Sequence, residues 1–390
     1  MRQQLDIFPL DIATGSAFCN RTEEIERLSI NIKGVTHTLI TAPRRMGKTS
    51  LVVETLNRLA IPRLIPVHLD LMLTSSPTSV QQYILKAVGE AISEIKPIAS
   101  KLNLAGQQLK KALLSLRPQI EITDDGFKIK LEATRTPVES ISDALTGLDQ
   151  LADKHGYRVV FYMDEFQQLA DMADNETLEA AIRHAAQHAR ATAYIFTGSN
   201  RHMLSLMFDD SARPLYHLCD KIVIARINTK EYAAYLKDQA KKCWKKPITD
   251  TAISAIMECT QQHPYYVNVL CRHLWREKAP PGAKKAKEAW LHYVQYERGR
   301  VISDINKLSN NQRELLILIA SEPTDTPYAE HYLSRVNFAR GSVRNILKAL
   351  IEQDFILCDQ DGFYRVQDPV IETYIRHKQQ DSTLIRIRIE

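Results

Sequence analysis

Short runs rich in apolar residues recur through the first part of the chain and predict strands, and the run at residues 159–163, which has no alternation, suits a strand buried on both faces of a parallel sheet. The runs lie near residues 36–41, 66–71, 159–163, 193–199 and 221–227. Stretches with helical periodicity separate them, and Asn20 is expected to cap a helix ahead of the first run. Because strands that alternate with helices form parallel sheets, we expect an α/β domain built on a parallel sheet.

The pattern changes after the last of these runs. From about residue 228 to residue 300 it is helical and predicts a small lid. Ser309 and Gln312 then form a capping box for a helix that runs to Ala320. A second helix is expected at residues 328–336.

A third helix is expected after Gly341, and residues 355–366 predict a hairpin that turns at an Asp-Gly pair, residues 361–362. Three helices and a hairpin make a winged-helix module. The apolar face of the third helix consists of Val343, Ile346, Leu347, Leu350 and Ile351, and its outward side carries Arg340, Arg344, Asn345 and Lys348. This basic side suits the major groove of double-stranded DNA, but the same pattern also describes an ordinary solvated helix face.

These elements divide the chain into three expected domains. A core covers residues 1–227, the helical lid covers residues 228–300, and a winged-helix domain with a C-terminal tail covers residues 301–390. The core contains a long insertion at about residues 95–137, with a hairpin-like segment around the Asp-Gly pair at 125–126. We expect this insertion to bind a protein partner.

Composition restricts the class of protein. The net charge of +5 and the pI near 8.7 are mild and leave room for local basic patches. The six cysteines are scattered and form no C-x-x-C pair, so neither a zinc site nor a disulfide framework is indicated. No apolar run has the length needed to span a bilayer, and the first residues lack the features of a secretion signal. We therefore expect a cytoplasmic protein without membrane contact.

A phosphate-binding motif follows the first apolar run, where Gly47, Lys48 and Thr49 begin a helix. In such a loop, backbone N–H groups and the positive end of the helix hold phosphate oxygens. Lys48 would reach the β- and γ-phosphates, and the Thr49 hydroxyl would ligate Mg²⁺. The sequence therefore predicts a nucleoside triphosphate site made by Ala42, Pro43, Arg44, Arg45, Met46, Gly47, Lys48, Thr49 and Ser50.

Ala42 departs from the usual form of this motif. It stands where G-x-x-x-x-G-K-[ST] has its first glycine, and alanine suits most backbone conformations other than those with φ > 0. A Gly-Lys-Thr triplet also occurs by chance at helix starts, so the site needs support from a second motif.

Two carboxylates at the end of the run at residues 159–163 supply that second motif. Parallel α/β sheets bind ligands at the carboxyl ends of their strands, so Asp164 and Glu165 are expected beside the loop. Asp164 would hold the Mg²⁺ shell, and Glu165 would orient and deprotonate an attacking water. The two acids could instead only cap the helix expected at residues 166–172, but capping does not require two adjacent acids.

Together these motifs resemble the archaeal-type ATPase branch of the STAND and AAA+ superfamily, over nearly all 390 residues. The resemblance rests on Phe18-x-x-Arg21-x-x-Glu24, the loop at residues 42–50, the Asp164-Glu165 strand, residues 197–201, residues 263–266 and Asp368-Pro369. It implies a P-loop NTPase core with a parallel sheet, followed by a helical lid and a winged-helix domain. It also implies ATP, rather than GTP, as the nucleotide.

The resemblance assigns further roles. Ser199 or a neighbour would sense the γ-phosphate, and Arg201 would reach the same phosphate, a task that suits the permanent charge and bidentate geometry of arginine. Arg201 could instead cap a surface loop. Further candidates for the contact with the γ-phosphate are Arg44, Arg45, Arg183 and Arg190. Pro264 would pack on the base, although Gln262 stands where the family usually has glycine.

A second metal is not expected. His184 and His188 have the i, i+4 spacing of a metal-binding pair, but Ala185 replaces the glutamate that the chemistry of the H-E-x-x-H motif requires.

Three functions remain open from the sequence. The first is a Mg²⁺-dependent ATPase in which nucleotide drives movement of the lid and winged helix against the core. The second is a DNA-binding or assembly scaffold that holds ATP without turnover. The third, implied by the resemblance alone, is a sensor in bacterial defence or a mobile-element module that forms a homo-oligomer on recognising its trigger. Glu165 favours the ATPase, because a purely structural nucleotide site needs no water-activating carboxylate.

Overall fold

The computed structural model describes residues 7–95, 116–123, 126–133, 136–336, 340–359 and 362–387. The chain divides into two compact units. The core unit comprises Arg21–Arg44 and Lys48–Ala225, and the C-terminal unit comprises Met1–Asn20, Arg45–Gly47 and Arg226–Glu390. The segments expected to form the lid and the winged helix thus belong to one unit, and the division into three domains stays a prediction.

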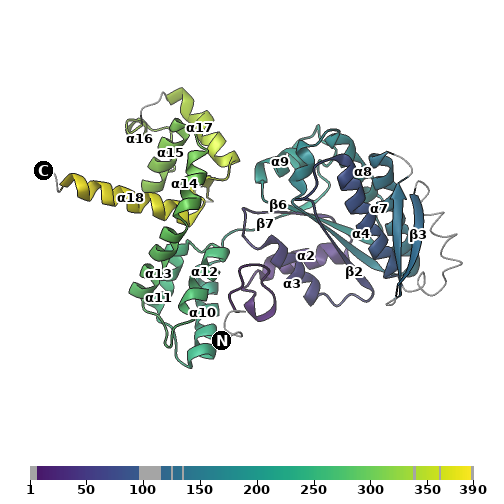
Figure 1. Cartoon of the computed structure of the whole chain (residues 1–390), viewed down its shortest axis with the longest axis horizontal. Coiled ribbons are helices and arrows are strands. Elements are labelled where there is room, and N and C mark those ends of the chain that lie inside the picture. The colour runs from purple at the N-terminus through teal and green to yellow at the C-terminus, as the bar shows by residue number, and fades with distance from the viewer. Residues whose placement is uncertain are drawn as a thin grey trace. The chain divides into compact units, whose positions relative to one another are not determined.

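The core unit is built on a five-stranded parallel sheet with the strand order β2-β5-β6-β1-β7, as the apolar runs predict (Figure 1). The strands are β1 (Thr38–Thr41), β2 (Leu64–Asp70), β5 (Arg158–Asp164), β6 (Thr192–Gly198) and β7 (Asp220–Val223). Every residue of β6 is buried, because this central strand has neighbours on both sides and helices on both faces. Because β5, β6 and β1 are adjacent and parallel, their carboxyl ends lie next to one another at one end of the sheet.

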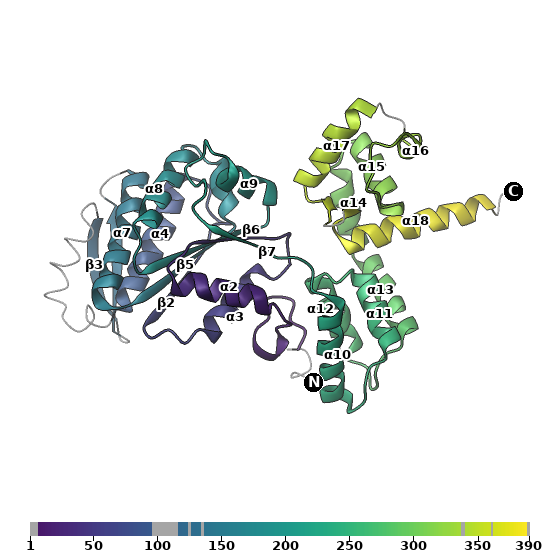
Figure 2. The ribbon, with the colours of Figure 1, turned by 180° about the vertical axis from the view of Figure 1, so that it is seen from behind.

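Helices cover both faces of this sheet. They are α2 (Thr22–Lys33), α3 (Lys48–Arg58), α4 (Pro77–Ser93), α7 (Pro137–His155), α8 (Asn175–Gln187) and α9 (Arg201–Asp209), with the 3-10 helix η2 (Phe166–Asp171) after β5. Right-handed crossovers put α3 on one face and the helices of the later crossovers on the other. Figures 1 and 2 show this division, with α2 and α3 on the side opposite α7 and α8. Phe161, Tyr194 and Phe196 lie fully buried in the core under α7 and α8.

The prediction that Asn20 caps the first long helix is wrong. This helix, α2, begins at Thr22, and Arg21 occupies the cap position with φ 72° and no side-chain cap. Asn20 also has a positive φ, 55°. Arg21 instead forms an ion pair with Glu24 at 3.1 Å, so a turn of the backbone, and not a capping side chain, starts this helix.

The insertion contains the expected hairpin. β3 (Leu116–Thr123) and β4 (Gly126–Ala133) pair antiparallel, with Thr123 opposite Gly126. The hydroxyl of Ser93 on α4 accepts the N–H of Ile129 at 3.0 Å. A Cβ on Gly89 would lie 2.2 Å from the Ile129 carbonyl oxygen, so this glycine allows β4 to approach α4. Residues 96–115 lie outside the described residues, and a partner for the insertion stays a prediction.

The C-terminal unit is mainly helical. Its elements are η1 (Gly15–Ala17), α10 (Thr229–Trp244), α11 (Asp250–Thr260), α12 (Pro264–Leu274), α13 (Ala283–Tyr296), α14 (Arg298–Asn306), α15 (Asn310–Ser321), α16 (Glu330–Leu333), α17 (Arg340–Glu352), β8 (Ile356–Cys358), β9 (Tyr364–Val366) and α18 (Pro369–Ile387). The capping box of Ser309 and Gln312 is confirmed at the start of α15. The hairpin β8–β9 is confirmed as well, and Gly362 in its turn has φ +84°. The second winged-helix element, α16, is shorter than predicted, and α17 begins one residue before Gly341.

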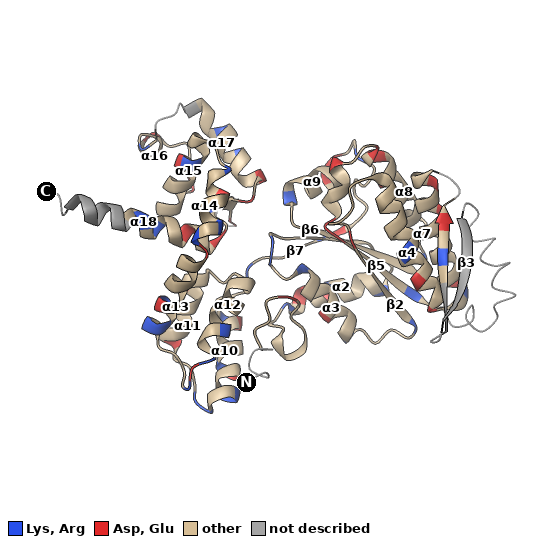
Figure 3. Cartoon of the chain, in the orientation of Figure 1, with Lys and Arg blue, Asp and Glu red and all other residues tan. Residues whose placement is uncertain are grey.

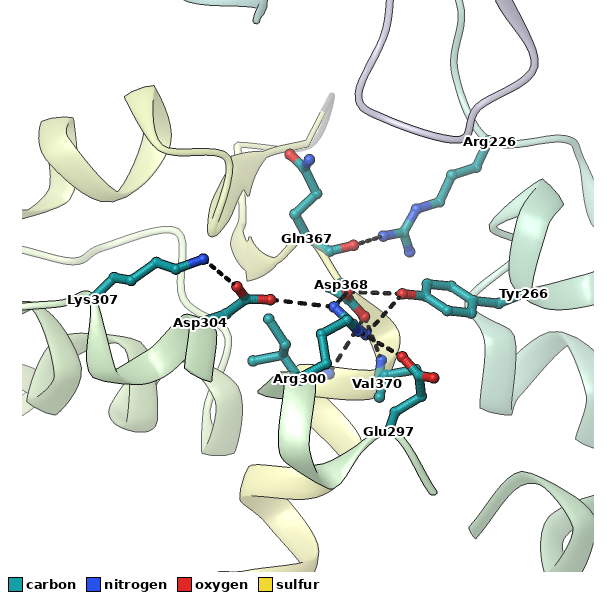
Figure 4. Close-up of polar contacts among 10 residues, drawn as sticks. Arg226, Tyr266, Glu297, Arg300, Asp304, Lys307, Gln367, Asp368 and Val370 are labelled. Carbon is teal, nitrogen blue, oxygen red and sulfur yellow. Dashed lines mark hydrogen bonds and ion pairs between the residues drawn. The ribbon is translucent and has the colours of Figure 1, made fainter. Parts of the chain in front are cut away.

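A polar network joins the lid helices to the winged helix within the C-terminal unit (Figure 4). Arg300 on α14 forms ion pairs with Asp368 at 3.1 Å and with Glu297 at 2.6 Å. The Tyr266 hydroxyl on α12 donates to the same Asp368 carboxylate at 2.8 Å. Asp368 also accepts the N–H of Val370 at 2.8 Å and so caps α18. One carboxylate thereby ties elements of the predicted lid to the last helix.

Arg226 adds a second tie in the same unit (Figure 4). Its guanidinium donates to the carbonyl oxygen of Gln367 at 2.8 Å, which Figure 4 shows, and to that of Gln261 at 3.0 Å. A single hydrophobic core continues from the lid helices into the winged helix, with Trp275 and Trp290 among its largest buried side chains. The shared core and both ties indicate that the lid and the winged helix form one body.

Candidate functional site

The loop of residues 42–47 connects β1 to α3 and has the backbone shape of a phosphate-binding loop. Arg45 and Gly47 have positive φ values of 63° and 89°, so these two residues make the sharp turn. Ala42 does not have a positive φ, and it is fully buried. Alanine is therefore compatible with the position where the usual motif has glycine. Pro43, Met46 and Ser50 are also buried, whereas Arg44 is exposed.

Lys48 and Thr49 start α3 with their side chains at this loop. The Lys48 ammonium donates to the carbonyl oxygens of Ala42 and Pro43 at 3.3 and 3.4 Å, which holds it inside the curve of the loop. The Thr49 hydroxyl donates to Asp164 at 3.1 Å. The structure thus brings the loop and the end of β5 together.

Asp164 is held by two hydroxyl groups that the sequence analysis did not assign to the site. Thr197 on β6 donates to its carboxylate, and the Tyr162 hydroxyl lies between Thr197 and Thr49, at 3.2 and 3.3 Å. Burial would raise the pKa of Asp164, but hydrogen bonds from Thr197, Tyr162 and the Glu165 N–H act against it, and the pKa lies below its ordinary value. The positive charge of Lys48 acts in the same direction.

The oxygen atoms of Thr49 and Asp164 suit a magnesium ion. Mg²⁺ binds hard oxygen ligands and usually takes only one or two carboxylates from the protein. A hydroxyl and an ionised carboxylate 3.1 Å apart match this preference. Thr49 and Asp164 would hold the ion, and the loop with Lys48 would hold the phosphates.

Glu165 lies next to this pair but has different partners. Its backbone is left-handed, with φ 50°, and its side chain makes no cap on η2, so the capping alternative is not what the structure shows. Its Oε2 atom accepts the Ser199 hydroxyl at 2.9 Å and the Ser199 N–H at 3.4 Å. The Gln167 amide donates to the same oxygen. Glu165 and Ser199, predicted from separate motifs, are thus brought together.

The structure does not test the predicted contacts of arginines with the γ-phosphate. Arg201 is the first residue of α9, after the N-cap Asn200, and its approach to a phosphate stays a prediction. Arg183 donates to the carbonyl oxygens of Pro214 and Tyr216, which gives its guanidinium a structural task.

Pro264 is the first residue of α12 in the C-terminal unit, after His263, and its packing on a base stays a prediction. His263 is only 5% exposed, and its Nδ1 atom has no hydrogen-bond partner. Burial, and then the positive charge of Arg226, lower the pKa of His263 to about 3. This imidazole is therefore neutral throughout the physiological range.

The histidine pair on α8 is used locally, because the His188 ring bonds to the backbone oxygen of His184 at 2.8 Å. Within the residues that the structure describes, no group of three or more His, Cys, Asp or Glu side chains is arranged to hold a metal. No helix in this part of the chain combines the length and the apolar character needed to cross a bilayer.

The candidate DNA surface lies on α17, within the winged helix. Arg344, Asn345 and Lys348 are exposed, while Val343, Leu347 and Leu350 on the opposite face are buried, as predicted. The side chain of Arg340 lies outside the described part of the structure. Lysines of the lid are mixed with acids (Figure 3). Their ion pairs include Lys242–Asp238, Lys285–Glu277 and Lys287–Glu258.

Comparison with known proteins bears on the fold. Residues 302–377 match a family model described as a probable winged helix domain. The Walker-type ATPase PABY2304 of Pyrococcus abyssi is 18% identical, with a TM-score of 0.64 over 95% of this chain and 99% of that chain. The ORC2 protein of Aeropyrum pernix, in ADPNP–ADP complexes, is 12% identical, with a TM-score of 0.56 over 96% and 98%. A search of curated proteins gives no match.

At these identities the comparisons establish fold rather than activity. The chain has a P-loop NTPase fold with a parallel five-stranded sheet, followed by a C-terminal winged helix. The predicted fold class is confirmed, and the predicted resemblance to archaeal ATPases is confirmed at the level of structure.

Proposed function

We propose that this chain binds ATP with Mg²⁺ at residues 42–50 and hydrolyses it, and that the nucleotide state controls the C-terminal unit. The observation that carries the proposal is the 3.1 Å hydrogen bond between Thr49 and Asp164, the two predicted Mg²⁺ ligands. The names of the similar structures, a Walker-type ATPase and a protein solved with ADPNP and ADP, give further support.

Each residue has a defined task in this proposal. The Lys48 ammonium, held inside the loop by two carbonyl oxygens, exchanges them for phosphate oxygens. Thr49 and Asp164 hold the Mg²⁺, which when bound offsets the negative charge of the phosphates. Glu165 orients the attacking water and accepts its proton, and Ser199 holds the Glu165 carboxylate in place.

The C-terminal unit is the element that responds. Its lid and winged helix share one core and the ties of Arg226 and Arg300, so a nucleotide-dependent change in the lid moves the winged helix with it. Nucleotide can shift such an equilibrium only through contacts that differ between ATP and ADP, and the γ-phosphate contacts supply that difference.

Steady-state hydrolysis and nucleotide binding test this proposal. Glu165→Gln should bind ATP as the wild type does and lose turnover by roughly 10²–10⁴. Lys48→Ala should weaken nucleotide binding itself. Glu176→Gln, which changes an exposed glutamate on α8, is the matched control and should leave both quantities unchanged. Turnover by Glu165→Gln at the wild-type rate would overturn the role of Glu165.

A second candidate is a DNA-binding scaffold that holds ATP without turnover. The exposed side chains of Arg344, Asn345 and Lys348 on α17 favour it. Assays with and without duplex DNA separate the two functions. Turnover that is stimulated by DNA and depends on Glu165 supports a DNA-coupled ATPase, whereas tight ATP binding without turnover in either condition supports the scaffold.

A further inference from the structure

Gln167 is a buried polar residue next to the proposed catalytic carboxylate, and no motif of the sequence analysis includes it. It lies on η2, two residues after Glu165, and is only 7% exposed. Its Nε2 atom donates to Glu165 Oε2. Its Oε1 atom is buried without a hydrogen-bond partner. Burying such an unpaired acceptor costs free energy, so another interaction of this side chain has to offset that cost.

Gly198 gives the Gln167 amide its room. A Cβ on Gly198 would lie 1.9 Å from Gln167 Oε1 and 3.1 Å from its Cδ. Gly198 does not have a positive φ, so its backbone conformation does not call for glycine. Leu204 Cδ1 would also lie 3.0 Å from this Cβ, so the Gln167 amide and Leu204 together occupy the space that a side chain at the end of β6 would need.

The donors around Glu165 converge on one of its two oxygens. Among the described residues, those that donate to its side chain are Gln167 and Ser199, and all of their hydrogen bonds end on Oε2. The two donors come from different elements, Gln167 from η2 and Ser199 from directly after the end of β6. Together they fix both the position and the rotation of the carboxylate.

We propose that Gln167 is a positioning residue that, with Ser199, clamps Glu165 Oε2 and leaves Oε1 to accept the proton of the attacking water. This inference rests on the proposed ATPase function. In that reaction the water oxygen forms a bond to the γ-phosphorus, and the bond from phosphorus to the β–γ bridging oxygen breaks. ADP leaves, and the proton of the water passes to Glu165 Oε1.

The clamp matters because water activation depends on geometry. A carboxylate that rotates freely about its last bond offers the water a correctly aimed oxygen only part of the time, and misplacement by about 1 Å can cost a factor of about 10² in rate. A residue that acts in this way changes the chemical step and leaves nucleotide binding alone.

Gln167→Met tests the clamp directly. Methionine keeps the length and most of the volume of the side chain but cannot donate a hydrogen bond. We expect kcat to fall by about ten- to a hundredfold, with KM and the Kd for ATP unchanged. Gln168→Met, at the next position of the same 3-10 helix, is the matched control and should keep the wild-type kcat.

Gly198→Ala tests the clamp by a second route, because its methyl group must displace the Gln167 amide from Glu165. We expect it to lower kcat as Gln167→Met does. In Gln167→Ala the amide is gone, and only the end of the Leu204 side chain, 3.0 Å from the new methyl group, has to give way. Adding Gly198→Ala should therefore cause little further loss of kcat, and the two changes should be strongly non-additive. Fully additive losses would overturn the proposal. An unfolding midpoint for each variant identifies any variant that fails to fold. If one of them fails, the effect of the other, Gln167→Met or Gly198→Ala, on kcat is enough to test the clamp.

The outcomes separate this inference from the proposed function. If wild-type turnover depends on Glu165 but Gln167→Met keeps kcat or raises it, only the clamp is overturned. A rise in KM at constant kcat would also overturn it, because Gln167 would then serve binding. If the wild type shows no turnover that depends on Glu165, the proposed function and the clamp both fail.

Discussion

The hydroxyl of Thr49 donates to the carboxylate of Asp164 at 3.1 Å, although 115 residues separate the two in the chain. They come from the start of α3 and from the end of β5, and β6 lies between β1 and β5 in the sheet. The fold therefore places two hard oxygen atoms side by side, and the lowered pKa of Asp164 keeps its carboxylate ionised.

Removing the Thr49 hydroxyl should weaken the binding of Mg²⁺, so that turnover needs a higher Mg²⁺ concentration. Thr49→Val keeps the shape of the side chain but loses the oxygen, so the Mg²⁺ concentration for half-maximal hydrolysis should rise about ten- to a hundredfold. Thr49→Ser keeps the hydroxyl and should behave nearly as the wild type. A magnesium titration of hydrolysis measures this, and equal titrations for the valine and serine variants would contradict the ligand assignment.

Breaking the tie of Arg300 should destabilise the C-terminal unit. Arg300→Ala removes ion pairs to Asp368 and Glu297, and we expect the free energy of unfolding to fall by on the order of 2 kcal/mol. All three tryptophans of the chain, Trp244, Trp275 and Trp290, lie in this unit, so their fluorescence during urea unfolding reports on it.

Arg298→Ala is the matched control for that measurement, because Arg298 is exposed on the same helix. It should change the free energy of unfolding by less than about 0.5 kcal/mol. Equal effects of the two substitutions would mean that the ion pairs of Arg300 contribute no more than the loss of any surface arginine.

Structural features that depend on a short stretch of neighbouring residues were predictable. Short runs rich in apolar residues indicated the parallel strands, and Gly47-Lys48-Thr49 and Asp164-Glu165 indicated the candidate site, because such motifs depend on local backbone and strand ends. The capping box at Ser309 is local in the same way.

Features that depend on distant contacts were not predictable. The start of α2 is a separate, local miss, because a left-handed backbone at Asn20 and Arg21 replaces the side-chain cap that the residue types suggest. The role of Gln167 becomes visible only when β6 brings Gly198 and Ser199 against η2. The union of lid and winged helix depends on Arg300 and Asp368, which are far apart in sequence.

His263 should make the C-terminal unit less stable in mild acid. Burial first, and then the charge of Arg226, lower its pKa from 6.5 to about 3 in the folded chain, while nearby Asp368 acts in the opposite direction. Between these two values the unfolded chain binds a proton that the folded chain excludes, so stability falls as the pH falls below 6.5. At pH 5 the loss from this residue should be about 2 kcal/mol.

Urea unfolding followed by tryptophan fluorescence at pH 7.5 and pH 5 measures this loss. His263→Gln removes the titrating group, so its stability should depend less on pH than that of the wild type, by about 2 kcal/mol over this interval. His273→Gln, at an exposed position of the same helix, should keep the wild-type pH dependence. Parallel pH profiles for the wild type and His263→Gln would show that His263 is not buried in neutral form.

DNA binding by α17 can be separated from general attraction by its dependence on salt. If Arg344 and Lys348 each neutralise one phosphate, changing both to alanine should lower duplex affinity and reduce the slope of log affinity against log salt by about 2. The ion pair of Lys348 with Glu352, at 3.6 Å, is exposed and too weak to prevent that contact. Changing Lys284 and Lys285 of α13 to alanine removes the same charge from the lid and should leave the slope unchanged. Equal reductions for both pairs would mean that any basic surface of the protein attracts DNA, and no reduction for the α17 pair would exclude this helix from the contact.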